Sequence, residues 1–171
     1  MKRPLSVAAC LVALGLAAAA AAPARLTAQT RFGAQLSWGD DDANLGLGAR
    51  AAFDLRSLLN TRGLEAVASF DYFFPEQSSG VDVEYWELNG NVTYLIPNAK
   101  GSLAPYVGSG LNIAHGSVDA SGVSSQSDTE AGLNLLGGTR FRTRSKLTPF
   151  AELRFELGGG ERVVLTGGIL F

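Results

Sequence analysis

Cysteine is almost absent from this chain of 171 residues, since Cys10 is the only one. It lies in an N-terminal segment that has a basic start at Lys2 and Arg3 and then an unbroken apolar run from Leu5 to Ala22. This layout is typical of a secretory signal peptide. The chain downstream would then contain no cysteine, which excludes disulfides and thiol chemistry from the mature protein.

We predict that residues 1–28 are this signal peptide, cleaved after Ala28, with cleavage after Ala24 as the alternative. Residues 29–171 then form a single domain. Removal of the signal peptide leaves eleven basic residues against sixteen acidic ones, a net charge of −5. An acidic mature chain of this kind argues against nucleic acid as a partner.

Long apolar runs are also lacking after the signal peptide, so no further membrane helix is predicted. The chain instead shows eight segments in which apolar and polar residues alternate, with no helical pattern between them. Such alternation predicts antiparallel β-hairpins. The expected strands are residues 31–38, 44–55, 64–74, 83–96, 103–114, 131–142, 147–157 and 162–171.

The connections between these segments differ in charge. Those after the odd-numbered segments are acidic or rich in Gly and Ser, and those after the even-numbered segments carry Lys or Arg. The longest is the stretch His115–Glu130, which we predict to be a mobile loop. Two ends of opposite character are expected for a chain that crosses a membrane repeatedly.

The polar faces of the segments carry a balanced set of charges. A membrane barrel turns its apolar residues to the lipid and fills its interior with polar groups, whereas a soluble barrel, the alternative here, does the reverse. The apolar faces carry no charge away from their ends, which favours the membrane barrel. Arginine, the only basic residue on the strands, forms bidentate bonds with carboxylates. We therefore predict an interior charge network of Arg31, Arg50, Arg140, Arg142, Arg154 and Arg162 with Asp54, Glu65, Asp71, Glu87, Glu152 and Glu156.

Aromatic residues are few, but they gather near the ends of the predicted strands. Membrane barrels carry aromatic girdles at both interfaces with water. The predicted girdle residues are Phe32, Phe53, Tyr94 and Phe141 at the basic end, and Trp38, Tyr72, Trp86 and Phe155 at the acidic end.

Three phrases, APYVGSGLNIA, TPFAELRFELG and VVLTGGILF, resemble the small eight-stranded outer-membrane β-barrel family of Gram-negative bacteria, and the resemblance covers residues 31–171. It implies an all-β, eight-stranded, antiparallel up-and-down transmembrane barrel after a cleaved signal peptide, set in outer-membrane lipid. In that family a last strand ending in an aromatic residue is read by the outer-membrane assembly machinery. The resemblance thus implies that Phe171 is an assembly signal.

The family's architecture does not determine an activity. The chain has no phosphate loop, zinc-ligand spacing or nucleophile elbow, so we expect no metal, no cofactor and no enzymatic activity. The expected role is structural or interactive, through acidic extracellular loops that include residues 115–130.

Two alternatives remain. His115 and Ser117 fall on one face of a strand, and outer-membrane lipid A deacylases use such a His-x-Ser pair with a downstream Glu, for which Glu130 is the candidate. The other alternative is a narrow porin-like passive channel, although eight strands leave an interior just wide enough for side chains.

Overall fold

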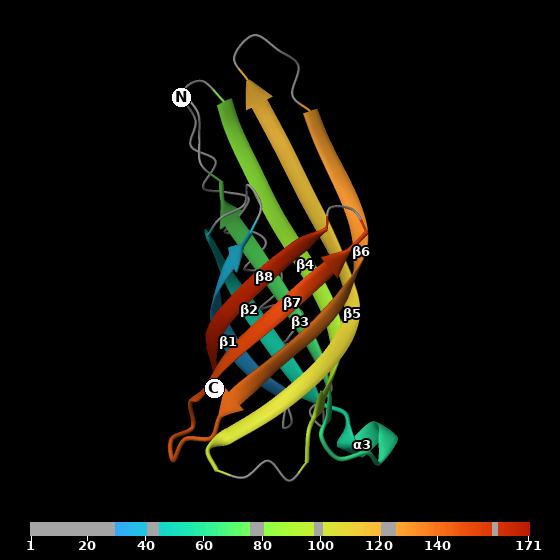
Figure 1. The fold of residues 1–171 in the computed structure, drawn as a ribbon, viewed down its shortest axis with the longest axis vertical. Coiled ribbons are helices and arrows are strands. Elements are labelled where there is room, and N and C mark those ends of the chain that lie inside the picture. The colour runs from blue at the N-terminus through green and yellow to red at the C-terminus, as the bar shows by residue number, and fades with distance from the viewer. Residues whose placement is uncertain (1–29, 41–44, 76–80, 98–100, 121–125, 159–160) are drawn as a thin grey trace. The chain divides into compact units, whose positions relative to one another are not determined.

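The computed structural model describes residues 30–40, 45–75, 81–97, 101–120, 126–158 and 161–171. The predicted signal peptide lies outside these residues. Eight antiparallel strands pair in chain order, and the last pairs with the first to close a barrel (Figure 1). The strands are β1 Thr30–Gly39, β2 Leu45–Asp54, β3 Leu64–Phe74, β4 Val81–Leu95, β5 Leu103–Ala120, β6 Gln126–Phe141, β7 Thr148–Leu157 and β8 Arg162–Leu170.

The predicted all-β, eight-stranded, antiparallel barrel is therefore confirmed. One short helix, α3 (Arg56–Leu59), lies in the connection between β2 and β3 and ends at Asn60, which adopts a left-handed conformation. Among the residues that the structure describes, no helix has the length and apolar character needed to cross a membrane.

Each strand turns most of its large apolar residues outward, although a few, such as Phe73, Val164 and Leu170, are buried. In β1, Leu36 leaves 56% of its surface exposed, whereas its neighbour Gln35 leaves only 2%. The same alternation runs through the other strands, so Leu, Val, Ile and aromatic side chains cover the outside while Gln, Asn, Arg and Glu are buried. A water-soluble barrel has the opposite arrangement, because apolar surface stabilises a fold when it is removed from water.

Glycines let large side chains fill the narrow interior. Tyr106 on β5 lies directly opposite Gly138 on β6, and a Cβ atom at Gly138 would come within 2.6 Å of the Tyr106 hydroxyl. Seven more inward glycines face a larger inward residue across the same kind of pair: Gly33 with Leu170, Gly46 with Phe73, Gly48 with Asp71, Gly108 with Leu136, Gly110 with Asn91, Gly132 with Asn112, and Gly168 with Phe150. Alternating large and small residues is how a small barrel packs its interior.

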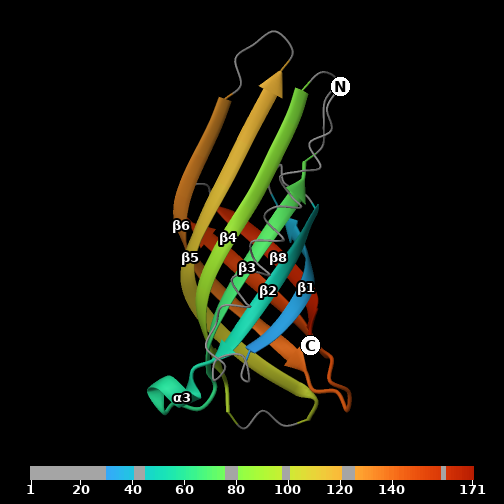
Figure 2. The ribbon, with the colours of Figure 1, turned by 180° about the vertical axis from the view of Figure 1, so that it is seen from behind.

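The prediction of a loop from His115 to Glu130 is wrong over most of its length. β5 continues to Ala120 and β6 begins at Gln126, with His115 paired to Thr129 and Ser117 paired to Ser127. The Ser, Asp and Gly residues have the composition of a loop, but the ladder between the strands continues regardless. Together with β4, these strands extend well beyond the others at one end of the barrel (Figures 1 and 2).

Two adjacent glycines on β8 test the packing of the interior. A Cβ atom at Gly168 would come within 2.6 Å of the Phe150 ring and 2.5 Å of the Ala34 carbonyl oxygen, whereas one at Gly167 meets nothing within 4 Å. We expect Gly168→Val to lower the free energy of unfolding by about 1–3 kcal/mol, as overpacking does. Gly167→Val is the matched control and should change it by less than about 0.5 kcal/mol. Urea unfolding of the protein refolded in lipid vesicles measures both, and equal losses would contradict the assignment of the two faces.

Candidate functional site

The interior of the barrel is the most distinctive chemical feature of the molecule, and its ion pairs form two clusters. The first lies at the end of the barrel that carries α3. There Glu65 on β3 receives hydrogen bonds from Arg31 at 2.7 Å and from Arg140 at 2.9 Å. Arg50 on β2 donates two hydrogen bonds to Glu152 on β7, at 2.5 and 3.0 Å. We call these five residues the α3-end cluster.

Two aromatic side chains complete the α3-end cluster. The Tyr106 hydroxyl donates a hydrogen bond of 2.9 Å to Glu152. The guanidinium of Arg50 lies 4.3 Å from the centre of the Phe150 ring, and that of Arg140 lies 5.3 Å from the centre of the Tyr106 ring. The two rings thus lie within cation–π distance of the guanidinium groups, whose terminal N–H groups donate to the carboxylates.

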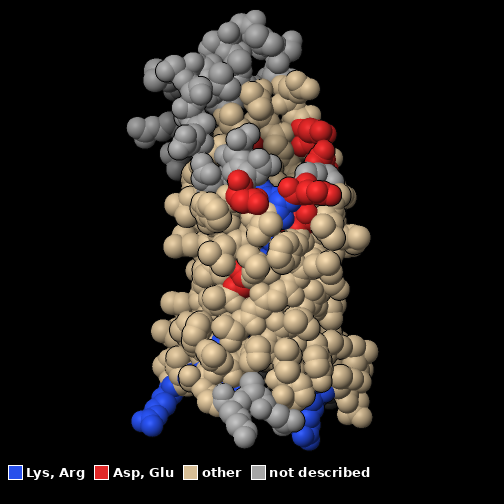
Figure 3. Space-filling model, viewed as in Figure 1, with Lys and Arg blue, Asp and Glu red and all other residues tan. Residues whose placement is uncertain are grey.

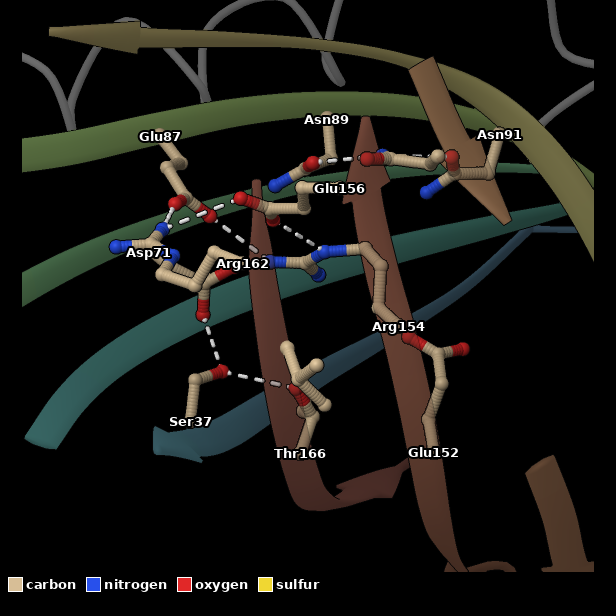
Figure 4. A network of polar contacts seen from close by, with 12 residues as sticks. Ser37, Asp71, Glu87, Asn89, Asn91, Glu152, Arg154, Glu156, Arg162 and Thr166 are labelled. Carbon is tan, nitrogen blue, oxygen red and sulfur yellow. Dashed lines mark hydrogen bonds and ion pairs between the residues drawn. The ribbon is translucent and has the colours of Figure 1, made fainter. Parts of the chain in front are cut away.

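The second cluster lies at the opposite end, where β4, β5 and β6 extend, and we call it the hairpin-end cluster. Arg154 on β7 donates to Glu87 on β4 at 2.8 Å and to Glu156 at 2.7 Å (Figure 4). Arg162 on β8 pairs with the same two carboxylates. Arg154 and Glu87 are completely buried. The four side chains thus form an alternating ring of two positive and two negative charges.

Further polar side chains face the interior beside these clusters. Asp71 accepts two hydrogen bonds from the Gln35 amide and one from the Ser37 hydroxyl, which also contacts Thr166 (Figure 4). Separately, the Asn134 amide donates to the side-chain oxygens of Asn89 at 2.8 Å and Asn91 at 3.0 Å. Asp71 was predicted, but its neutral partners and the three asparagines were not named from the sequence, although each occupies the inward parity that the charged residues already marked.

Many of these bonds join strands that are not neighbours in the barrel. Arg50 and Glu152 connect β2 with β7, Glu65 and Arg140 connect β3 with β6, and Asn134 connects β6 with β4. The interior is therefore crossed by polar contacts rather than merely lined by them. An arrangement of this kind can stabilise the barrel and block the passage of solutes.

Two residues of the predicted network lie at the edge of the interior, where the strands end. Arg142 is exposed beyond the end of β6, where it donates a hydrogen bond of 3.1 Å to the Gly101 carbonyl. Asp54 is half-buried at the end of β2 and accepts the backbone N–H of Arg56 at 2.8 Å, next to α3. Both have the inward parity, but the strands end there, so the side chains contact turn backbone. The other ten predicted residues take part in the contacts described above. Arg31 is one of them, although it is only partly buried.

The predicted girdle aromatics all lie on the outer face. Phe32, Trp38, Tyr94, Phe141 and Phe155 are exposed, while Phe53, Tyr72 and Trp86 are half-buried. Phe171 is 63% exposed, and its backbone exchanges hydrogen bonds with Phe32 of β1 in both directions. Its role as an assembly signal stays a prediction.

The structure does not assemble the predicted His-Ser-Glu group. His115 and Ser117 follow the outward parity of Leu111, and the His115 ring nitrogen Nδ1 lies 2.7 Å from the Thr129 hydroxyl. The His115 ring also stacks on Trp86, with ring centres 5.1 Å apart. Glu130 is directly opposite Ala114, whose side chain is buried in the interior. Glu130 therefore belongs to the other face of the sheet.

An apolar exterior around a closed, ion-paired interior defines the class of the molecule, which is that of an eight-stranded transmembrane β-barrel. No protein-family profile and no curated protein sequence matches the chain. Several solved structures, however, are similar to it. The crystal structure of Neisserial surface protein A is similar with a TM-score of 0.62 at 16% identity, covering 82% of this chain and 94% of that one.

Two further structures show the same fold. The N-terminal β-barrel domain of Pseudomonas aeruginosa OprF has a TM-score of 0.61 at 17% identity, over 84% of this chain and 98% of that one. Ail, the attachment invasion locus protein of Yersinia pestis, has a TM-score of 0.52 at 14% identity, over 82% and 93%. The chain thus has the fold of small outer-membrane barrels, and these likenesses support the predicted location in a bacterial outer membrane.

The Arg50–Glu152 pair gives a test of the interior. Arg50→Met leaves the Glu152 carboxylate buried without its cation, so we expect a loss of about 3–5 kcal/mol in the free energy of unfolding. Adding Glu152→Gln should recover most of it, because the amide oxygen still accepts the Tyr106 hydroxyl. Arg142→Met, outside the interior, is the control and should cost less than about 0.5 kcal/mol. Equal losses for Arg50→Met and Arg142→Met in urea unfolding would refute the assignment.

Proposed function

We propose that this protein is a sealed structural barrel of the bacterial outer membrane that holds the projecting strands β4, β5 and β6 outside the cell, where they contact a partner. The observation that carries this proposal is the set of ion pairs that cross the interior between β2 and β7, β3 and β6, and β4 and β7. The barrel is neither an enzyme nor a channel in this proposal.

The buried clusters argue against a channel. A solute that passed along the barrel would have to displace Arg50 from Glu152 and Arg154 from Glu87. The first displacement separates two buried charges, and the second opens the ring of four charges at the hairpin end. Breaking one such pair costs about 3–5 kcal/mol. The eight strands also enclose too little space for a path beside these side chains.

The surface charges support the proposed orientation. Acidic residues gather toward the end where β4, β5 and β6 project, with some basic atoms visible between them, and Lys and Arg side chains project at the opposite end (Figure 3). The acidic set includes Asp40, Glu84, Asp128 and Glu130, and the basic set includes Arg56, Arg62, Arg144 and Lys146. Acidic projecting strands outside the cell match the predicted extracellular interaction role.

The hydrolase alternative has less support. A serine nucleophile needs a base and an acid that orients the base. The partner of the His115 Nδ1 atom is the hydroxyl of Thr129, which supplies no negative charge. Glu130 lies on the other face of the sheet. We therefore do not extend the proposal to lipid hydrolysis.

Conductance distinguishes a sealed barrel from a channel. The mature chain, inserted in planar lipid bilayers, should show no steady conductance. A fourfold variant, Arg50→Ala, Glu152→Ala, Glu87→Ala and Arg154→Ala, removes one pair from each cluster and should conduct, provided that it retains heat-modifiable gel mobility. Steady conductance of the unaltered protein would overturn the proposal.

Single-cysteine labelling tests the orientation. The predicted mature chain has no cysteine, so Ser127→Cys on β6 and Ser102→Cys at the opposite end each introduce a unique thiol at an exposed position. A membrane-impermeant maleimide should label Ser127→Cys on intact cells and Ser102→Cys only after the outer membrane is permeabilised. The reverse pattern would invert the topology.

A further inference from the structure

β6 has an open edge along its projecting part. β7 pairs with β6 only from Leu133 to Arg140, whereas β5 pairs with it as far as Gln126. Within the described part of the chain, no strand pairs with the other edge of residues 126–131, and all six of these residues are exposed. An open edge presents unpaired backbone N–H and C=O groups that can pair with another chain.

The register identifies which backbone groups face this edge. Arg142 donates its backbone N–H to Ser102 on the β5 side. The β5–β6 register contains no bulge from Leu103 to Val118, and successive residues of a strand direct their backbone groups to opposite neighbours. Even-numbered residues of β6 therefore point to β5. Ser127, Thr129 and Ala131 point to the open edge.

At the centre of the open edge, one backbone N–H group already has a partner within the chain. The backbone N–H of Thr129 donates a hydrogen bond of 2.8 Å to the carboxylate of Asp128. Glu130 follows on the same face of β6 as Asp128. The Asp128 carboxylate thus occupies the Thr129 N–H, and any strand that adds to the edge must draw this carboxylate away from it.

A second copy of this chain is a poor candidate for the added strand. In an antiparallel pairing of residues 126–131 with the same residues of another copy, the side chains that share a face must lie opposite each other. Every such register places Asp128 or Glu130 opposite or diagonal to the same acidic residues of the other chain. Like charges opposite each other are destabilising, so the acids act against self-association.

We propose that residues 126–131 of β6 bind an extended, basic segment of an extracellular protein by strand addition. A Lys or Arg of that segment takes over the Asp128 carboxylate, and a carbonyl of its backbone then accepts the Thr129 N–H. Backbone pairing gives affinity and the alternating side chains give selectivity, as in other cases of strand addition. The inference rests on the proposed function, since it needs the projecting strands outside the cell.

The test measures binding of a fluorescent seven-residue peptide of alternating lysine and valine to the full mature protein in nanodiscs of zwitterionic lipid. A peptide of alternating glutamate and valine is the comparison. We expect only the basic peptide to bind, with an affinity that falls as salt rises. Asp128→Asn combined with Glu130→Gln should weaken this binding at least tenfold.

Two variants at one position separate strand addition from simple charge attraction. Thr129→Pro removes the outward N–H and should reduce binding of the basic peptide at least tenfold, while Thr129→Ala keeps the N–H and should bind as the unaltered protein does. Heat-modifiable gel mobility shows that both variants fold. Equal binding by the two variants would overturn the proposal, because the peptide would then be held by charge alone.

Two other outcomes have distinct meanings. Stable dimers of the unaltered protein, cross-linked through Ser127→Cys, would make a second copy the occupant and would also overturn the inference. Failure of peptide binding in a protein that shows no conductance leaves the sealed barrel intact and rejects only strand addition. Steady conductance rejects the sealed barrel independently of any peptide.

Discussion

A polar group inside a barrel that is surrounded by lipid has to find its partner within the barrel, because leaving a charge unpaired in an apolar medium costs several kcal/mol. Much of this structure follows from that requirement. Five arginines occupy the interior, and each lies within hydrogen-bond or ion-pair distance of a glutamate. Arg154 donates hydrogen bonds to both Glu87 and Glu156. Glu65 accepts hydrogen bonds from both Arg31 and Arg140.

The same requirement explains part of the distribution of glycine. Long polar side chains that meet across a narrow interior need space beside their own strands, and a glycine directly opposite supplies it. Tyr106 reaches Glu152 by lying over Gly138, and Asp71 reaches Ser37 from a position over Gly48. Packing and polar satisfaction are thus achieved by the same residue pairs, and the glycines of β8 show how sharply the two faces differ.

The projecting part of β6 is not subject to the polar pairing and packing that hold in the interior. Residues 126–131 of β6 are not paired with β7. Their side chains are exposed and take no part in the contacts of the interior. A strand edge of this kind is prone to self-association. Asp128 and Glu130 oppose that association, and the contact between Asp128 and the Thr129 N–H occupies the centre of the edge. In the function that we propose, the barrel supplies stability and the acidic edge supplies the interaction.

The sequence by itself determined the strands, their parity and the residues that face inward, because alternation with a period of two is a local property that each segment carries alone. Residues such as Leu36 and Gln35 need no partner to reveal their faces. Only the tertiary structure decided which charges pair, since Arg50 and Glu152 lie 102 positions apart and meet through barrel closure. It also decided where strands end, which placed Asp54 and Arg142 at the edge of the interior and turned most of a predicted loop into β5 and β6. Composition describes a residue's local preference, whereas the ladder between two strands continues as long as each strand finds a partner.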